Sequence, residues 1–311
     1  MRGGRRQPGR QRGSALLIAL VTAALAAVIA TAMLERGQRS LARGEALLAS
    51  ERAWQYARGM ELLAGNKLRQ AVAEGADPGV LDNSWTVPFE VPGGMVQGRV
   101  VDQGGRFNLN ALGHPDRAVA TEARAAFARL LELLGLRPVI ADELADWLDG
   151  AVMPRPGSAA SDYYGRLDPP YRTAGVPLAN TSELRWLRSV DEAAWRQLEP
   201  LVAALPESEL RVNVNTARPE VLAAVIEELG VEEAGRVIAD GPFSDPVRFR
   251  EHPLVAGVIR PDEQIRIVIR SRWYMAQARV VLDGVERDYF RLINAAGAGY
   301  DGRRYLSQGV P

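Results

Sequence analysis

The sequence predicts an α+β fold with a long N-terminal helix, a small antiparallel sheet and a large helical block inserted between the strands. Three observations predict it. An uncharged apolar stretch at 14–34 opens a helical pattern that continues to about residue 73. Alternating apolar runs occupy 85–101 and return after residue 264, as half-buried strands do. Between these runs, from about residue 118, the periodicity is helical.

The apolar stretch from Ser14 to Leu34 is long enough to cross a membrane, because an α-helix needs ~20 apolar residues to span a hydrocarbon core of ~30 Å. Arginines without any acid precede it: Arg2, Arg5, Arg6, Arg10 and Arg12. A basic cluster on one flank of a span holds that flank in the cytoplasm. The sequence therefore predicts a single-pass membrane protein whose N-terminus is cytoplasmic and whose larger part lies on the other side.

The residues before the apolar stretch resemble the leader of a type IV prepilin. A secretory signal peptide has a shorter apolar region, ~7–15 residues, which ends in a small-residue cleavage site. Here the stretch continues directly into Glu35, and the small residues Gly13 and Ser14 precede it instead. This layout predicts a leader at 1–13 that is cut between Gly13 and Ser14 and leaves the helix attached. A plain signal anchor is the alternative.

After such a cut, position five of the remaining chain is Ile18, where type IV pilins and most pseudopilins keep a glutamate. A carboxylate inside a membrane is costly unless it has a partner. In pilin-like fibres that partner is the N-terminal amine of the neighbouring subunit on the tip side. A subunit without such a neighbour gains nothing from the acid, so Ile18 predicts a position at the tip. An ordinary membrane anchor would also lack the acid.

Composition excludes several kinds of site. At 311 residues the chain is long enough for a second module, at ~100–200 residues per domain. It contains no cysteine, which excludes disulfides, thiolate metal sites and cysteine nucleophiles. His114 and His252 are too far apart in sequence to suggest a zinc motif. The 38 basic and 38 acidic residues balance, and loss of the arginine-rich leader would leave an acidic chain, which disfavours nucleic-acid binding.

The helical pattern breaks at 74–79, and strands are predicted after it. The runs at 85–91 and 95–101 flank a Pro-Gly-Gly sequence and predict a hairpin, in which Pro88 is tolerated only at a sheet edge. Asp283-Gly284 is a tight-turn pair between two later strands. The strands predicted near the C-terminus are 264–270, 274–282 and 287–293.

The inserted block is predicted to be entirely helical. At the start of one short helix, the hydroxyls of Thr181 and Ser182 can satisfy free amides, and Glu183 favours its positive end. Other helices are predicted at 121–134, 138–147, 215–230 and 232–239. The predicted segments are the leader at 1–13, the membrane span at 14–34, a first helix-and-sheet part at 35–110, the helical insert at 111–260, and a second strand-rich part at 261–311.

An ordered set of motifs resembles the type II secretion system protein K family, the large minor pseudopilins. The motifs are the leader RQRGSALLIALV, GRFNLNAL at 105–112, ADWLDG at 145–150, PYRTAGVPLANTSELR at 170–185, VNVNTARPEVLAAV at 212–225 and SRWYMAQARVVLDG at 271–284. They span nearly the whole chain. The resemblance implies a pilin-like domain, in which the long helix packs on the sheet, interrupted by a SAM-like or helix-hairpin-helix-like helical domain.

The resemblance also implies a function. The chain would sit in the inner membrane, with its C-terminal domain in the periplasm, at the tip of the pseudopilus together with minor pseudopilins I and J. There it would nucleate the fibre that drives folded proteins across the outer membrane. Minor pseudopilin H, the major pseudopilin and the inner-membrane secretion platform are further implied partners. The prepilin peptidase would cut after Gly13 and N-methylate Ser14.

Members of this family are similar in binding calcium near a DWxD…GxEDxYY stretch of the insert. The carboxylates that match it here are Asp146, Asp149 and Asp162. Ala160 and Ser161 stand where the family has acids, and Ala151-Val152 replace a second acidic pair. Calcium takes ~6–8 oxygen ligands, so the resemblance implies a weakened or lost calcium site, and no cofactor is required. Asp146 and Asp149 could instead face solvent and cap helix ends.

Two other functions were weighed against secretion. The segment 212–239 resembles a helix-hairpin-helix, a fold often used on DNA, which makes a membrane-anchored DNA-uptake protein the alternative. Glutamates crowd its turn, namely Glu227, Glu228, Glu232 and Glu233, and they oppose a phosphate backbone, so no nucleic-acid partner is expected. An enzyme is not expected either, because the chain lacks a Gly-rich phosphate loop, a nucleophile elbow and a histidine-centred constellation.

Overall fold

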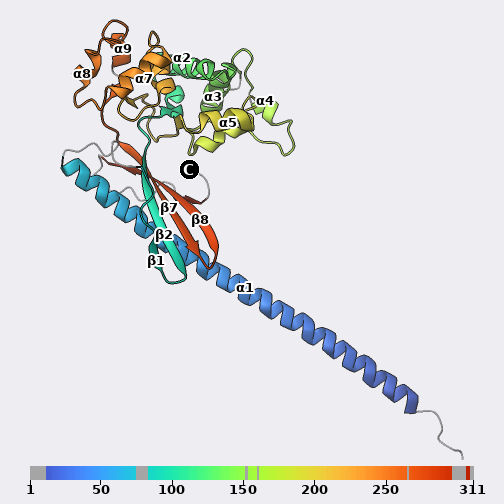
Figure 1. The fold of residues 1–311 in the computed structure, drawn as a ribbon. Coiled ribbons are helices and arrows are strands. Elements are labelled where there is room, and N and C mark those ends of the chain that lie inside the picture. Colours follow the sequence, from blue (N-terminus) through green and yellow to red (C-terminus); the bar gives the residue numbers. More distant parts are fainter. Residues whose placement is uncertain are drawn as a thin grey trace, which may run out of the picture. The chain divides into compact units, whose positions relative to one another are not determined.

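The computed structural model describes residues 12–74, 83–150, 153–159, 161–264, 266–295 and 306–308 (Figure 1). The chain forms two compact units, residues 1–55 and 56–311. Helix α1 (Arg12–Ala73) begins in the first unit and continues into the second. The long N-terminal helix predicted from the apolar stretch and its continuation is thereby confirmed.

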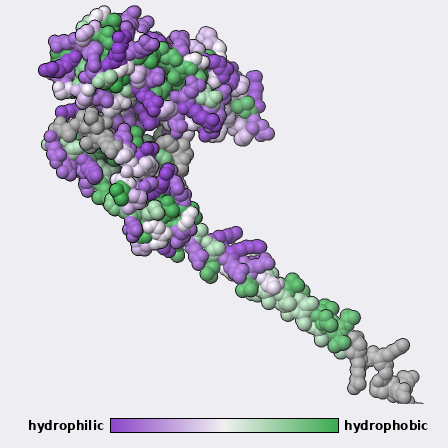
Figure 2. Space-filling model, viewed as in Figure 1, coloured by the Kyte–Doolittle hydropathy of each residue, from purple (hydrophilic) through white to green (hydrophobic). Residues whose placement is uncertain are grey.

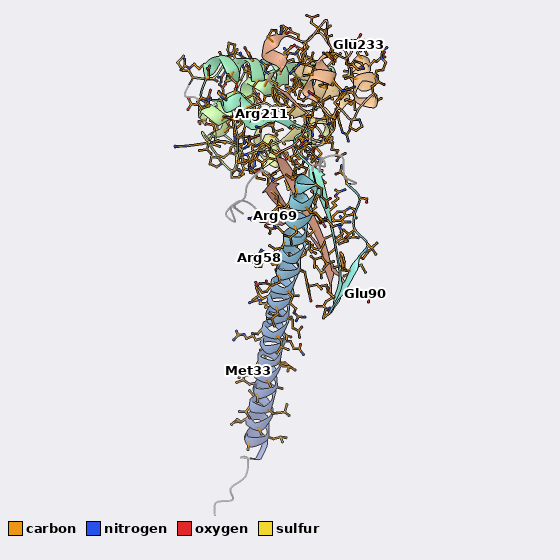
Figure 3. The ribbon with its side chains drawn as sticks, turned by 90° about the vertical axis from the view of Figure 1, so that its left-hand side faces the viewer. Met33, Arg58, Arg69, Glu90, Arg211 and Glu233 are labelled. Carbon is orange, nitrogen blue, oxygen red and sulfur yellow. The ribbon has the colours of Figure 1, made fainter. Side chains whose placement is uncertain are left out.

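In the first unit, the apolar side chains of α1 point outward into open space. Figure 2 shows hydrophobic residues over the N-terminal part of the helix, followed by a hydrophilic band. Figure 3 shows Met33 projecting from the helix, and its side chain is 69% exposed. The hydroxyls of Thr22 and Thr31 donate to carbonyls of the preceding turn, so they present no free polar group. This part of α1 is long and apolar enough to cross a membrane.

The second unit contains a five-stranded antiparallel sheet with the strand order β1-β2-β7-β8-β9. Its strands are β1 (Phe89–Val91), β2 (Gly94–Asp102), β7 (Trp273–Leu282), β8 (Val285–Asn294) and β9 (Leu306–Gln308). The predicted hairpin is confirmed, and β1 lies at the edge, where the preceding Pro88 leaves no ladder bond unmade. Asp283 and Gly284 join β7 to β8 with φ angles of 51° and 79°, as a tight hairpin turn requires.

The C-terminal part of α1 packs on one face of this sheet through small residues. Ala57, Ala64 and Leu68 are buried there. A Cβ atom at Gly98 of β2 would lie 2.5 Å from the Cε of Met60, so the end of the Met60 side chain packs directly over this glycine. Along β7 the side chains alternate strictly between buried and half-buried, which marks the face that the helix covers.

The helical block lies between β2 and β7 in the sequence, as predicted. Its helices are η2 (Leu109–Gly113), α2 (Arg117–Leu133), α3 (Val139–Asp149), α4 (Ser161–Tyr164), η3 (Thr181–Trp186), α5 (Glu192–Leu198), α6 (Pro219–Val225), α7 (Val231–Ala239), α8 (Pro246–Arg250) and α9 (Pro261–Gln264). One apolar core joins them, and its largest fully buried members include Phe107, Phe127, Phe249 and Tyr164.

Two short parallel strand pairs also belong to the block, and they correct one prediction. Strand β3 (Phe107–Asn108) pairs with β4 (Val202–Ala203), and β5 (Val212–Asn213) pairs with β6 (Ile267–Val268). The run 264–270 was predicted as a strand of the main sheet, but only its centre is a strand, and that strand pairs with β5. An alternating pattern predicts a half-buried strand but does not predict which strand pairs with it. Here Ile267 packs into the core of the helical block.

The cap of η3 differs by one residue from the prediction. The side chain of Asn180, rather than a hydroxyl of Thr181, accepts from the Ser182 amide at 2.7 Å. The carboxylate of Glu183 in turn accepts from the Asn180 amide at 3.0 Å, which completes a capping box.

Candidate functional site

The predicted processing residues lie at the beginning of α1. Gly13 and Ser14 are helical, and residues 1–11 of the predicted leader lie outside the described residues. Ile18 is 62% exposed on the helix surface. From Ala15 to Leu34 the helix carries no charged side chain, so it offers a neighbouring helix shape and apolar contact only.

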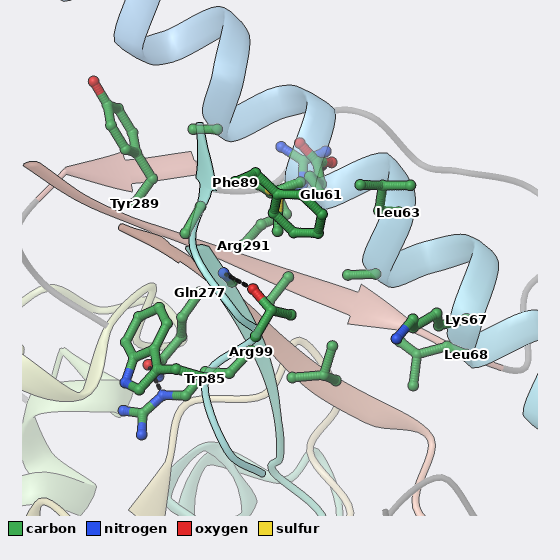
Figure 4. A pocket seen from close by; sticks show the side chains of 18 of the residues that line it. Glu61, Leu63, Lys67, Leu68, Trp85, Phe89, Arg99, Gln277, Tyr289 and Arg291 are labelled. Carbon is green, nitrogen blue, oxygen red and sulfur yellow. Dashed lines mark hydrogen bonds and ion pairs between the residues drawn. The ribbon is translucent and has the colours of Figure 1, made fainter. Parts of the chain in front are cut away.

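A pocket of about 570 Å³ lies between the C-terminal part of α1 and the sheet (Figure 4). Its lining is mainly apolar and includes Phe89 from β1 and Leu63 from the helix, both about half exposed. At its inner end Glu61 of α1 forms an ion pair with Arg291 of β8 at 3.2 Å, with both side chains almost fully buried. Burial raises the pKa of Glu61, although Arg291 opposes this. The half-exposed apolar lining of this pocket suits packing against another protein rather than proton transfer.

The other face of the sheet carries arginines stacked on a tryptophan. The guanidinium carbons of Arg99 and Arg279 lie 4.7 and 4.9 Å from the centre of the Trp85 ring. Arg279 also pairs with Asp288 at 2.9 Å, and Arg99 donates to Gln277 at 2.6 Å. These contacts hold the side chains of Arg99, Gln277 and Arg279 in place along a second pocket of about 500 Å³. Residues of the strands line this pocket together with residues in and near η3 and α5.

Asp102, at the end of β2, joins the sheet to the helical block. Asp102 is only 7% exposed to solvent. It accepts hydrogen bonds from the hydroxyls of Thr216 and Ser271, both at 2.7 Å, and from the Asn213 amide at 3.4 Å. It also accepts from the Gly104 backbone amide at 2.5 Å. One carboxylate therefore ties together the exit from the sheet, the middle of the block and the return to β7.

Two glycines allow these segments to approach. A Cβ atom at Gly104 would lie 2.2 Å from the Ser271 Oγ, and one at Gly105 would lie 2.4 Å from the Thr216 carbonyl oxygen. The Gly-Gly sequence at 104–105, where the GRFNLNAL motif begins, is therefore required by close contact at the junction.

An Asn-X-Asn sequence occurs twice, at 108–110 and at 213–215, and its last asparagine holds loops together in each case. Asn110 donates to the carbonyls of Leu178 and Leu205 and accepts from the Leu178 amide. Asn215 donates to the carbonyls of Phe243 and Ile269 and accepts from the Phe243 amide. Asn110 is buried and Asn215 is half-buried, and side-chain amides with these partners specify one arrangement of the loops. The motif occurs twice in the sequence, and this repetition is the signal that could have predicted a structural role for its asparagines.

The three carboxylates matched to the calcium stretch are not gathered around one point. Asp146 and Asp149 both pair with Arg155, whereas the Asp162 side chain is exposed to solvent. Among the described residues, no group of three or more histidines or carboxylates could hold a metal ion. Ala160 and Ala151-Val152 lie outside the described residues. The alternative that Asp146 faces solvent is wrong, because its side chain is 1% exposed.

The histidines are occupied locally. His114 accepts from the Asp116 amide at 3.0 Å, and His252 lies 3.0 Å from the exposed carboxylate of Asp240. In the segment that resembles a helix-hairpin-helix, the Gly230 amide at the turn donates to Glu233 at 3.0 Å. An amide that a phosphate would use is thus engaged by a carboxylate.

Comparison with known proteins identifies the family. Two family models described as "Type II secretion system (T2SS), protein K" match residues 105–207 and 212–269. The type II secretion system protein K of Pseudomonas aeruginosa is 36% identical over 70% of this chain and 68% of its own. That of Klebsiella pneumoniae is 32% identical over 95% of this chain and 97% of its own. The chain belongs to the type II secretion system protein K family.

A solved structure has the same fold. It is described as "The Crystal Structure of the GspK-GspI-GspJ complex from enterotoxigenic Escherichia coli Type 2 Secretion System" and matches with a TM-score of 0.71. The match covers 82% of this chain and 95% of the other at 22% identity. The α+β class expected from the sequence is confirmed, and so is the resemblance to the protein K family, which consists of structural pseudopilins. By length and composition, the apolar part of α1 fits a single-pass membrane anchor.

Proposed function

We propose that this minor pseudopilin forms the tip of the type II secretion pseudopilus and nucleates its assembly for the export of folded proteins across the outer membrane. The observation that carries the proposal is Ile18. A shaft subunit needs a carboxylate at this depth to meet the amine of the subunit above it, whereas a tip subunit has no subunit above it. Membership of the protein K family supports the same position.

The tip would be built with minor pseudopilins I and J, since the solved relative was crystallised in a K–I–J complex. Minor pseudopilin H, the major pseudopilin and the inner-membrane platform would contact the assembled fibre. Residues 35–110 and 261–311 would form the pilin-like domain, and residues 111–260 the inserted helical domain. Exposed apolar side chains at the pocket beside α1, such as Phe89 and Leu63, are suited to contacts of this kind.

Before assembly, the prepilin peptidase would cut the chain between Gly13 and Ser14 and N-methylate Ser14. The arginines of the leader would keep that end in the cytoplasm, so the second unit would fold in the periplasm, anchored in the inner membrane. The DNA-uptake alternative finds no support in the geometry, because Glu233 engages the Gly230 amide and Glu227 pairs with Arg260 at 2.8 Å.

A glutamate at position 18 should change where the chain sits in the fibre. We expect Ile18→Glu to insert into the membrane normally but to enter the shaft, because the new carboxylate can pair with a neighbouring amine. The ratio of this chain to the major pseudopilin in sheared fibres would rise, and secretion would fall. Ile18→Leu is the matched control and should behave as the wild type. An unchanged ratio and unchanged secretion in Ile18→Glu would refute the tip position.

A further inference from the structure

The loop between α3 and α4 is closed by polar contacts within the chain. Helix α3 ends at Asp149, and Gly150 then adopts a φ of 60°. A Cβ atom at Gly150 would lie 3.0 Å from the Cα of Gly175, and the Gly175 amide donates to the Trp147 carbonyl at 2.9 Å. The beginning of the loop therefore lies in close contact with the segment after α4, just beyond the carboxylates of α3.

Arg155 occupies both of those carboxylates. Its guanidinium forms ion pairs with Oδ1 of Asp146 and, at 3.0 Å, with Oδ2 of Asp149. Its backbone amide donates to Oδ2 of Asp146 at 2.8 Å. Both oxygens of the buried Asp146 are thus engaged by a single residue. Because a guanidinium has five N–H donors in a rigid fork, it can bridge two carboxylates that face the same space.

The charge of Arg155 is firmly held. Burial disfavours its protonated form, but hydrogen bonds to Asp149 and attraction to Asp146 outweigh that effect and raise the pKa of Arg155. A guanidinium at this place repels a divalent cation and offers it no oxygen. A calcium ion would have to displace it and then find ~6–8 oxygens.

Some further groups of the loop are paired within the chain, whereas the buried hydroxyl of Ser158 has no hydrogen-bond partner among the described residues. Ser161, where the family has an acid, shares a hydrogen bond of 2.7 Å between its hydroxyl and that of Thr173. Arg188 donates to the Gly157 carbonyl and bridges to the buried Glu143 at 2.8 Å. Ion pairs and internal hydrogen bonds therefore occupy several of the oxygens that a calcium ion at this place would need.

We propose that the guanidinium of Arg155 takes the structural place of calcium in this member of the family, cross-linking Asp146 and Asp149 and closing the α3–α4 loop without a metal. The helical block then folds independently of calcium. The inference concerns this loop alone, so it can fail while the assignment as a tip subunit stands.

The first test compares thermal unfolding of the full-length chain in detergent, in a chelator and in millimolar calcium. We expect the same apparent Tm in both, and no calcium retained after purification when the metal content is measured by mass spectrometry. A calcium-dependent rise in Tm, or one calcium ion retained per chain, would overturn the proposal. This measurement requires no variant, so it decides the matter even if the substitutions below prevent folding.

The second test removes the cross-link in the presence of chelator. Arg155→Ala should lower the apparent Tm by roughly 4 °C or more, since a buried carboxylate loses its counter-charge. Arg155→Lys should recover only part of the loss, because an ammonium cannot bridge two carboxylates as a fork does. Arg185→Ala is the matched control, because Arg185 forms an exposed pair with Glu192 in the same block. If Arg155→Ala unfolds together with the wild type and the control, Arg155 has no such role.

Discussion

Replacing Gly13 by alanine is expected to leave the leader on the protein. The small residue before the apolar stretch is the feature that distinguishes a prepilin leader from a plain signal anchor, and the resemblance places the cut directly after it. The chain from cells that contain the prepilin peptidase should then keep residues 1–13, whereas the wild type should begin at Ser14. Intact mass and N-terminal sequencing of the membrane fraction distinguish the two forms.

The matched control for this experiment is Gly37→Ala, the same exchange farther along α1. A Cβ atom at Gly37 meets nothing within 4 Å, so this variant should be processed as the wild type is. A Gly13→Ala chain of mature size would show that the residues before Ser14 are not a prepilin leader. Retention of the leader by both variants would point to a general defect of the altered helix instead.

Replacing Asp102 by alanine is expected to have the largest effect on stability. The change removes one carboxylate and leaves several donors without their acceptor, among them the buried Gly104 amide and the half-buried hydroxyls of Thr216 and Ser271. An unsatisfied buried group costs about 1–3 kcal/mol, so a total of about 3 kcal/mol is expected. For a unit of this size the apparent Tm should fall by roughly 6–12 °C. Thermal unfolding of the full-length chain in detergent measures this shift.

Asp240→Ala is the control for Asp102. Its side chain is 67% exposed and lies beside His252, so its removal should change stability by less than about 0.5 kcal/mol. Equal unfolding temperatures for the two variants would mean that Asp102 does not hold the sheet and the helical block together. A lower unfolding temperature for Asp102→Ala, with that of Asp240→Ala unchanged from the wild type, would confirm that it does.

Local patterns were sufficient for the parts of the fold that local forces determine. The uncharged stretch from Ser14 predicted α1, and Asp283-Gly284 predicted the turn between β7 and β8. The run around Ile267 was assigned to the wrong sheet, because alternation is the same whichever strand lies beside it. The cap at Asn180 was missed by one residue, since asparagine, threonine and serine are all good caps and occur there in succession.

The polar junctions were beyond the reach of sequence patterns for a different reason. The partners of Asp102 lie 114 and 169 positions away, and no spacing rule relates residues so distant in the chain. Arg155 lies only nine positions after Asp146, but a lone arginine between two prolines matches no known ligand pattern. The paired asparagines at 108–110 and 213–215 did carry a visible signal, as a repeated motif too polar for the apolar runs that contain it.

The central claim is that this chain assembles with minor pseudopilins I and J at the tip of the fibre. Its most direct test is to express the tagged full-length chain with I and J from the same organism, dissolve the membranes in detergent and purify through the tag. The account predicts that I and J elute with the chain and remain with it on size exclusion. Elution of the chain alone, although all three proteins are present in the membrane, would contradict it.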